Sequence, residues 1–166
     1  DQDVAVFAGH QSDYTFASSE DGLTVTVTQR STGDVDTVTN VETLSFADGD
    51  IAVSHDGTGL VLTGQSTDSI EVVGPVGVTV LGEAGNDTLT GGAGNDTIDG
   101  GAGDDTLTGG LGDDVIIASD GSDTVSVSLG SGVLTVEAAS QMSVSANEEA
   151  FNTLLNHASS IETAVR

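Results

Sequence analysis

The chain has 166 residues, a formal net charge of −25 and no cysteine, and its fixed cations are two arginines. Such an acidic chain lacks the Lys and Arg clusters that bind nucleic acids or anionic membrane surfaces, so neither is expected as a partner. A disulfide scaffold and thiol chemistry are excluded. No apolar run approaches the roughly 18 residues of a membrane span, so membrane insertion is not expected either.

Residues 1–57 are predicted to form a small antiparallel β unit that contains most of the aromatic residues. Asp-Gly and Gly-Asp turn signals separate short β-branched or alternating runs at residues 4–7, 14–17, 23–28, 42–46 and 51–53. We interpret Asp34 and Asp36 as exposed turn acids, because no Gly and closing Glu follow them at the spacing of an EF-hand. Arg30 is expected to form a local ion pair.

Residues 58–81 are predicted to be metal-free coils that cap the upstream end of a repeat. Apolar runs at 60–62, 70–73 and 76–81 recur at about ten residues, without the regularly placed aspartates of the next block. A terminal coil of this kind would cover an otherwise unpaired strand edge.

Residues 82–126 repeat with a period of nine, as GEAGNDTLT, GGAGNDTID, GGAGDDTLT, GGLGDDVII and ASDGSDTVS. Position eight is always aliphatic, and position six is always aspartate, at Asp87, Asp96, Asp105, Asp114 and Asp123. This period matches neither a helix nor a simple strand alternation. It predicts a parallel β-roll, a solenoid in which short strands around position eight alternate with turns. Glycines at positions one, two and four are expected to supply positive φ angles.

Two nonapeptides make one coil, so turns two copies apart stack at the strand spacing of roughly 4.8 Å. Asp105 then lies near Asp87 and Asp123, and Asp96 lies near Asp114. Two carboxylates at that distance repel by about 3 kcal/mol at an effective dielectric constant of ~20. A hard cation that takes about six to eight oxygen ligands removes this repulsion. The stack therefore predicts three full Ca²⁺ sites, with partial sites at the ends of the block.

Calcium is favoured over zinc because the chain offers neither Cys nor clustered His, and over magnesium because magnesium prefers a small octahedral shell. The other candidate ligands lie in the same turns, mostly as backbone carbonyls: Gly82, Ala84, Gly85, Asn86, Gly91, Gly92, Ala93, Gly94, Asn95, Gly100, Gly101, Ala102, Gly103, Asp104, Gly109, Gly110, Gly112, Asp113 and Gly121. The alternative interpretation is a flexible Gly/Asp linker. We expect that state without calcium, since the coils contain too little apolar mass to fold alone.

The pattern GGxGxDxUx, with U a large aliphatic residue, resembles the calcium-binding RTX repeat, also called the hemolysin-type repeat. The run DTVTNVETLSFADGDIAV at 36–53 resembles, less specifically, β-rich segments found beside RTX blocks. The resemblance implies a module of a larger secreted or surface protein that a Gram-negative bacterium exports by type I secretion. Neither end of the chain resembles a complete protein, so we interpret it as a fragment.

Residues 127–144 are predicted to be trailing strands of the roll. The runs 124–129 and 133–137 flank a Gly-Ser-Gly sequence, which fits a hairpin or one more coil. Ser145 and Glu148 then make a capping box, and apolar residues follow at helical spacing, which predicts an amphipathic helix within 145–166. We expect it to pack on the end of the roll. The alternatives are a partner-binding face and part of an export signal.

No catalytic arrangement is found, because His10, His55 and His157 lie far apart and the HExxH and GxSxG motifs are absent. The predicted function is non-enzymatic: a calcium-binding module that folds on binding extracellular calcium and stabilises the rest of a larger polypeptide. Two alternatives stay open. One is an adhesin or carbohydrate-binding segment that contacts surface polysaccharide or another cell, and the other is an accessory domain of a secreted enzyme.

Overall fold

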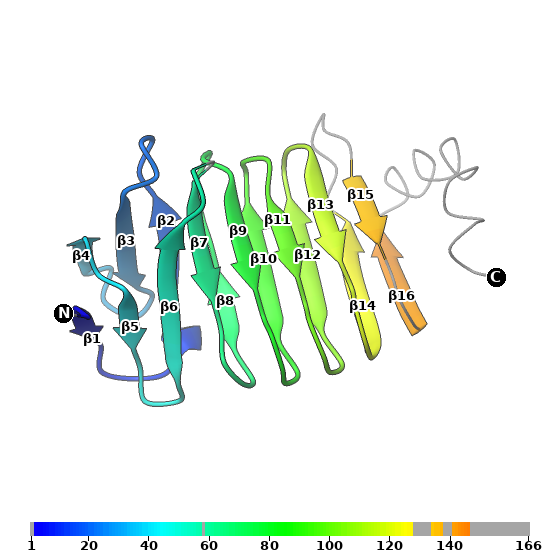
Figure 1. Cartoon of the computed structure of the whole chain (residues 1–166), viewed down its shortest axis with the longest axis horizontal. Coiled ribbons are helices and arrows are strands. Elements are labelled where there is room, and N and C mark those ends of the chain that lie inside the picture. The colour runs from blue at the N-terminus through cyan, green and yellow to red at the C-terminus, as the bar shows by residue number, and fades with distance from the viewer. Residues whose placement is uncertain (1, 58, 128–133, 138–140, 147–166) are drawn as a thin grey trace.

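The computed structural model describes residues 2–57, 59–127, 134–137 and 141–146 (Figure 1). These residues form a flattened solenoid of two facing β layers, with the N-terminal strands at one end and β15 (Leu134–Glu137) and β16 (Gln141–Ala146) at the other. Apart from a short 3-10 helix, η1 (Gln11–Asp13), the regular elements of the described residues are strands. The predicted fold class, a mostly β protein built on a parallel β-roll with antiparallel strands at its N-terminal end, is confirmed.

The first layer is one eight-stranded sheet that begins antiparallel and continues parallel. In spatial order its strands are β1 (Val4–Val6), β5 (Thr43–Ser45), β6 (Asp50–His55), β7 (Leu60–Thr63), β9 (Val78–Leu81), β11 (Thr97–Asp99), β13 (Asp114–Ile117) and β15 (Leu134–Glu137). β6 pairs antiparallel with β5 and β7, whereas each step from β7 through β15 is parallel, and β1 pairs parallel with β5.

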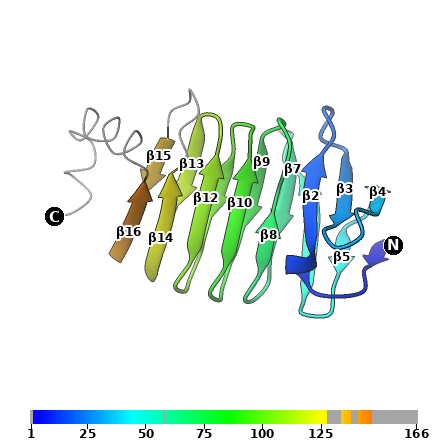
Figure 2. The same ribbon diagram turned by 180° about the vertical axis from the view of Figure 1, so that it is seen from behind.

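The second layer combines a five-stranded parallel sheet with a three-stranded antiparallel sheet. The parallel strands are β8 (Ser69–Glu71), β10 (Thr88–Gly92), β12 (Thr106–Gly110), β14 (Ser122–Val127) and β16 (Gln141–Ala146). The antiparallel strands are β2 (Tyr14–Ser18), β3 (Thr24–Gln29) and β4 (Val35–Thr39). A bridge between Phe16 and Val72 places β2 beside β8, so the antiparallel sheet continues the layer (Figure 2).

The strand register confirms that repeat copies two apart lie side by side. Leu89 pairs with Leu107 and Leu107 with Val125 in one sheet, and Ile98 pairs with Ile116 in the other. These position-eight side chains are completely buried. The nine-residue period therefore builds an aliphatic ladder along the inside of each layer, because every second copy returns to the same side of the coil.

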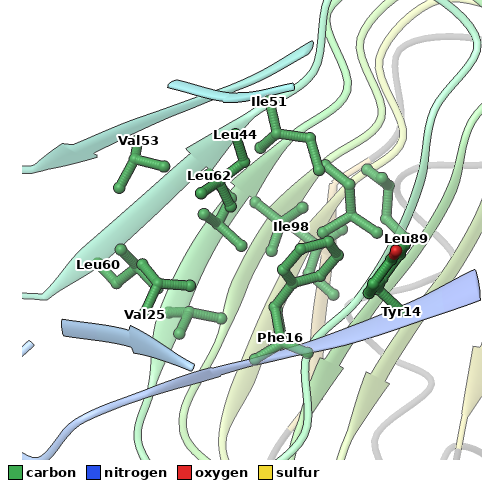
Figure 3. Packing of buried hydrophobic residues seen from close by; sticks show 14 of the residues in the cluster. Tyr14, Phe16, Val25, Leu44, Ile51, Val53, Leu60, Leu62, Leu89 and Ile98 are labelled. Carbon is green, nitrogen blue, oxygen red and sulfur yellow. The ribbon is translucent and has the colours of Figure 1, made fainter. Parts of the chain in front are cut away.

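A single hydrophobic core runs from the aromatic N-terminal end into this ladder (Figure 3). Phe46 stacks on Phe7 with ring centroids 5.3 Å apart, and Phe16 meets Phe46 edge to face at 5.9 Å. The Tyr14 hydroxyl donates a hydrogen bond to the Ala8 carbonyl. The aromatic rings of the described residues are thus concentrated at the end that contains no repeats, where large rings bury much more area than the repeat aliphatics.

Residues 122–127 and 134–137 continue the solenoid rather than pair as a hairpin, because β14 and β15 lie in opposite layers. The predicted helix falls largely on residues 147–166, which lie outside the described residues. Residues 145 and 146 end β16. The proposed division at 57 and 144 stays a prediction. Among the described residues, no helix is long and apolar enough to cross a membrane.

Candidate metal centre

The five position-six aspartates are buried, with at most 4% of their surface exposed, and they form two ladders along the edges of the solenoid. Oδ1 of each one accepts a backbone N–H from the preceding coil. The backbone amide of Asp87 donates to Oδ1 of Asp105 at 2.9 Å, and the backbone amide of Asp105 donates to Oδ1 of Asp123 at 3.0 Å, both across 18 residues. On the other edge Asp96 donates to Asp114 at 3.0 Å. The members of each predicted same-side pair are therefore neighbours in a ladder. We call each aspartate with its turn a rung of the ladder.

One ladder extends one rung further upstream than the repeat pattern indicates. The Asp68 amide donates to Asp87 Oδ1 at 2.7 Å, across 19 residues. The Gly64 amide donates to the Leu81 carbonyl, so Gly64 begins the upstream turn as Gly82 begins the next one. Asp68 follows Gly64 after four residues, whereas Asp87 follows Gly82 after five, so the upstream turn is one residue shorter. The expectation that residues 58–81 contain no aspartate of this kind is wrong for Asp68. The aliphatic Ile70 two residues later was the sequence signal for it.

Oδ2 of Asp87, Asp96 and Asp105 is buried and has no hydrogen-bond partner. The pKa of Asp87 and Asp96 is raised to about 6, chiefly by loss of solvation and in smaller part by the carboxylate of the next coil. Burial also raises the pKa of Asp105 and Asp114. A buried carboxylate in this situation requires either a proton or a nearby cation.

The described residues supply no such cation. The chain contains no lysine, and Arg30 is engaged by Glu71, with Nη2 2.5 Å from Oε2. No group of three or more His, Cys, Asp or Glu side chains is placed to hold a metal within the described part of the chain. A metal held here would therefore need two carboxylates from stacked turns together with backbone carbonyls, and such an all-oxygen set suits a hard cation.

Glycine at position one is required for space. Gly82, Gly91, Gly100 and Gly109 do not have positive φ angles, so that expectation is wrong for this position. A Cβ on any of them would lie 2.3 or 2.4 Å from Oδ2 of the aspartate five residues later. The unpartnered oxygens thus lie directly against glycine Cα atoms, and a larger residue would displace them.

Glycine at position four allows the turns to stack closely. A Cβ on Gly103 would lie 1.7 Å from the Gly85 carbonyl oxygen, and one on Gly121 would lie 1.6 Å from that of Gly103. Gly103 and Gly121 also have φ angles of 140° and 148°. Position two is similar, since a Cβ on Gly110 would lie 1.9 Å from the Gly92 oxygen. Carbonyl oxygens therefore line the contact between stacked turns.

Positions three and five join consecutive turns. The Ala102 carbonyl accepts the Gly85 amide at 2.8 Å, and Ala84 and Ala102 form a parallel bridge. Oδ1 of Asn86 accepts the Asp104 amide at 3.1 Å, whereas Oδ1 of Asn95 accepts the Asp113 amide at 3.0 Å. The Asn86 and Asn95 side chains thus hold the next turn in place. The role of these positions as metal ligands stays a prediction.

These features define the class as a parallel β-solenoid with a buried carboxylate in each stacked turn. The model of the RTX calcium-binding nonapeptide repeat matches four copies, over residues 79–107 and 99–134. The chain therefore contains an RTX repeat module, and RTX repeats are structural calcium-binding units rather than catalytic ones.

The histidines lie apart from the aspartate ladders. His10 lies 3.4 Å from Asp48 at the surface, and His55 is exposed at the end of β6, while His157 lies outside the described residues.

Among solved structures, the extracellular lipase LipA from Serratia marcescens aligns with 20% sequence identity and a TM-score of 0.34. The alignment covers 86% of this chain and 26% of the lipase chain. This chain thus corresponds to only a part of the lipase's length. No curated protein sequence gives a significant match.

Proposed function

We propose that residues 82–126 bind three calcium ions, between Asp87 and Asp105, between Asp105 and Asp123, and between Asp96 and Asp114. The observation that supports this assignment is the set of buried, unpartnered Oδ2 atoms on Asp87, Asp96 and Asp105. Each is an anionic oxygen without a proton donor in a chain that lacks lysine. Partial sites are expected where the ladders end.

The residues of the turns divide the work of binding. A backbone N–H from the preceding coil holds Oδ1 and fixes the orientation of each carboxylate, which leaves Oδ2 available for the metal. Glycine at position one leaves room for Oδ2, and the closely stacked turns supply carbonyl oxygens. When bound, calcium provides the positive charge that lets two stacked carboxylates stay ionised.

Binding and folding are coupled because two stacked turns exist only in the folded solenoid. At a free calcium concentration about ten times the Kd, each site stabilises the fold by about 1.4 kcal/mol, so three sites contribute about 4 kcal/mol. Extracellular calcium modules bind at about 10⁻⁴ to 10⁻³ M. The repeats then stay unfolded in a cell of low calcium and fold outside it, where they stabilise a larger secreted or surface protein.

The test is far-UV circular dichroism of the chelator-treated chain during a calcium titration, repeated with magnesium. We expect a cooperative gain of β signal that calcium produces and magnesium does not. A spectrum that is unchanged by calcium, or an equal response to both metals, would refute the proposal.

A further inference from the structure

The carboxamide of Gln11 takes the place of a coil that would precede β8. Gln11 is completely buried although it belongs to a short turn of 3-10 helix far from the repeats. Its Nε2 donates to Asp68 Oδ1 at 2.7 Å, and its Oε1 accepts the Ser69 amide at 2.9 Å. One side chain therefore contacts the carboxylate and the strand start of the same rung.

Within the repeats, the backbone makes the same two contacts. Asp87 Oδ1 accepts the Asp68 amide at 2.7 Å, and the Thr88 amide donates to the Asp68 carbonyl at 2.9 Å. In the same way, Asp105 Oδ1 accepts the Asp87 amide, and the Thr106 amide donates to the Asp87 carbonyl. The donor and acceptor of the Gln11 side chain thus replace the N–H and C=O of a missing peptide rung, which a primary amide can do because it offers both groups.

This cap leaves Asp68 without an open oxygen. Besides the Gln11 bond to Oδ1, Oδ2 of Asp68 accepts the amides of Gln65 at 2.8 Å and Ser66 at 3.0 Å. Asp87, one rung further on, keeps an unpartnered Oδ2. The transition from a rung that the protein itself satisfies to rungs that need an external cation therefore falls between Asp68 and Asp87.

The cap is fixed to the aromatic end of the core. The Gln11 amide donates to Asp48 Oδ1 at 2.9 Å, and Arg30 connects the same region to β8 through the Ser12 carbonyl at 3.0 Å and Glu71 at 2.5 Å. Large rings pack behind it, including Tyr14 at 5% exposure. This part of the chain therefore has apolar contacts of its own that do not depend on the repeats.

We propose that residues 2–57 and 59–81 fold without calcium and act as a template, and that Gln11 is the positioning residue that holds the first rung of the Asp68 ladder. This inference rests on the proposed function. Gln11 holds Asp68, and the Asp68 amide orients the Asp87 carboxylate. Calcium-dependent coils then add onto this rung in the correct register.

The test exchanges the donor and acceptor of this contact in the full chain. Gln11→Glu places two buried carboxyl groups against each other, and Asp68→Asn alone places two amides together. The double variant Gln11→Glu with Asp68→Asn restores one donor and one acceptor and leaves the net charge unchanged. Gln2→Glu, at an exposed position, is the matched control for charge.

Two signals are followed: the near-UV circular dichroism of Tyr14, the single tyrosine of the chain, and the far-UV β signal during calcium titration. In chelator, the wild-type chain should keep the Tyr14 band and lack the β signal of the repeats. Suppose that a substitution lowers the folding equilibrium constant about 30-fold. Because three ions bind together, the calcium midpoint then rises by the cube root of this factor, about threefold. We expect at least that rise for Gln11→Glu, and recovery in the double variant.

Loss of the wild-type Tyr14 band in chelator would overturn the inference. So would an unchanged midpoint for Gln11→Glu, or a double variant that is no better than Gln11→Glu. If Gln11→Glu does not fold at all, recovery in the double variant still decides the question. A wild-type chain with no calcium-dependent gain of β signal would instead refute the proposed function, and recovery of thermal stability by the double variant would then test the cap by itself.

Discussion

The Asp68 amide lies 2.7 Å from Oδ1 of Asp87, although Asp68 precedes the segment that the repeat pattern covers. The carboxylate ladder of the repeats therefore starts on a residue of the capping coils. Asp105 and Asp123 continue it with the same bond at each step. The aspartates of the ladders differ in how many of the proposed calcium sites they border. Single substitutions can therefore separate their contributions to calcium binding.

Asp105 borders two of the three proposed calcium sites, whereas Asp114 borders one. Asp105→Asn is therefore expected to remove about two calcium ions from the binding stoichiometry, and Asp114→Asn about one, since each loses the charge that holds the metal. Isothermal titration calorimetry measures both. Asp34→Asn is the control, because Asp34 is exposed and lies outside the repeat turns. Equal losses in all three variants would contradict the assignment.

Gly100→Ala is expected to destabilise the calcium-loaded chain by about 3 kcal/mol or prevent its folding, because the new Cβ would lie 2.3 Å from Asp105 Oδ2. Gly33→Ala is the comparison, since Gly33 has a φ of 76° but no heavy atom within 4 Å of its Cβ position. It should cost only about 1 kcal/mol, through backbone strain. Thermal unfolding in excess calcium measures both. Similar effects would argue against steric crowding at position one.

The pKa values predict opposite pH responses with and without calcium. Asp87 and Asp96 have folded pKa values of about 6 against 3.8 in a free chain, so the folded state binds these protons more tightly. Their contribution to the stability of metal-free coils is complete below pH 3.8 and is lost as the pH rises through about 6. With calcium, protons compete for the same oxygens, so the calcium midpoint should rise as the pH falls below about 6.

The far-UV β signal of the repeats in chelator and the calcium midpoint, each measured at pH 4.5 and 7.5, check this pair of responses. A chain with Asp87→Asn and Asp96→Asn should show a shallower pH dependence in chelator, which separates these carboxyls from the general effect of net charge. A larger β signal of the metal-free wild type at pH 7.5 than at pH 4.5 would show that the sign is wrong.

Arg30→Ala is expected to lower stability by about 1 kcal/mol and to leave the calcium stoichiometry unchanged. Its ion pair with Glu71 is partly exposed, with 41% of each side chain accessible, so solvent screens the attraction. Urea unfolding in saturating calcium measures the loss. A change in the number of bound ions would mean that the ion pair has a role in the metal sites.

The period of nine was enough to predict the β-roll, the pairing of Asp87 with Asp105 and the burial of Leu89 and Leu107. These features depend only on contacts that recur at a fixed separation of 18 residues. A strict repeat states such contacts directly, because every second copy returns to the same edge of the coil.

The cap could not be predicted in the same way. Asp68 lies 19 residues from Asp87, so a shortened turn moves it out of the pattern. Gln11 reaches Asp68 across 57 residues, and a single glutamine in an irregular segment has no local signature for such a contact. The space required at Gly82 was also hidden, since the sequence shows that glycine recurs but does not show which atom lies against it.

The most direct test of the calcium assignment is anomalous X-ray diffraction from crystals grown with calcium. We expect anomalous peaks between Asp87 and Asp105, between Asp105 and Asp123, and between Asp96 and Asp114, with none between Asp68 and Gln11. Peaks confined to exposed acids such as Asp34 and Asp36, with no density between the stacked turns, would contradict the assignment.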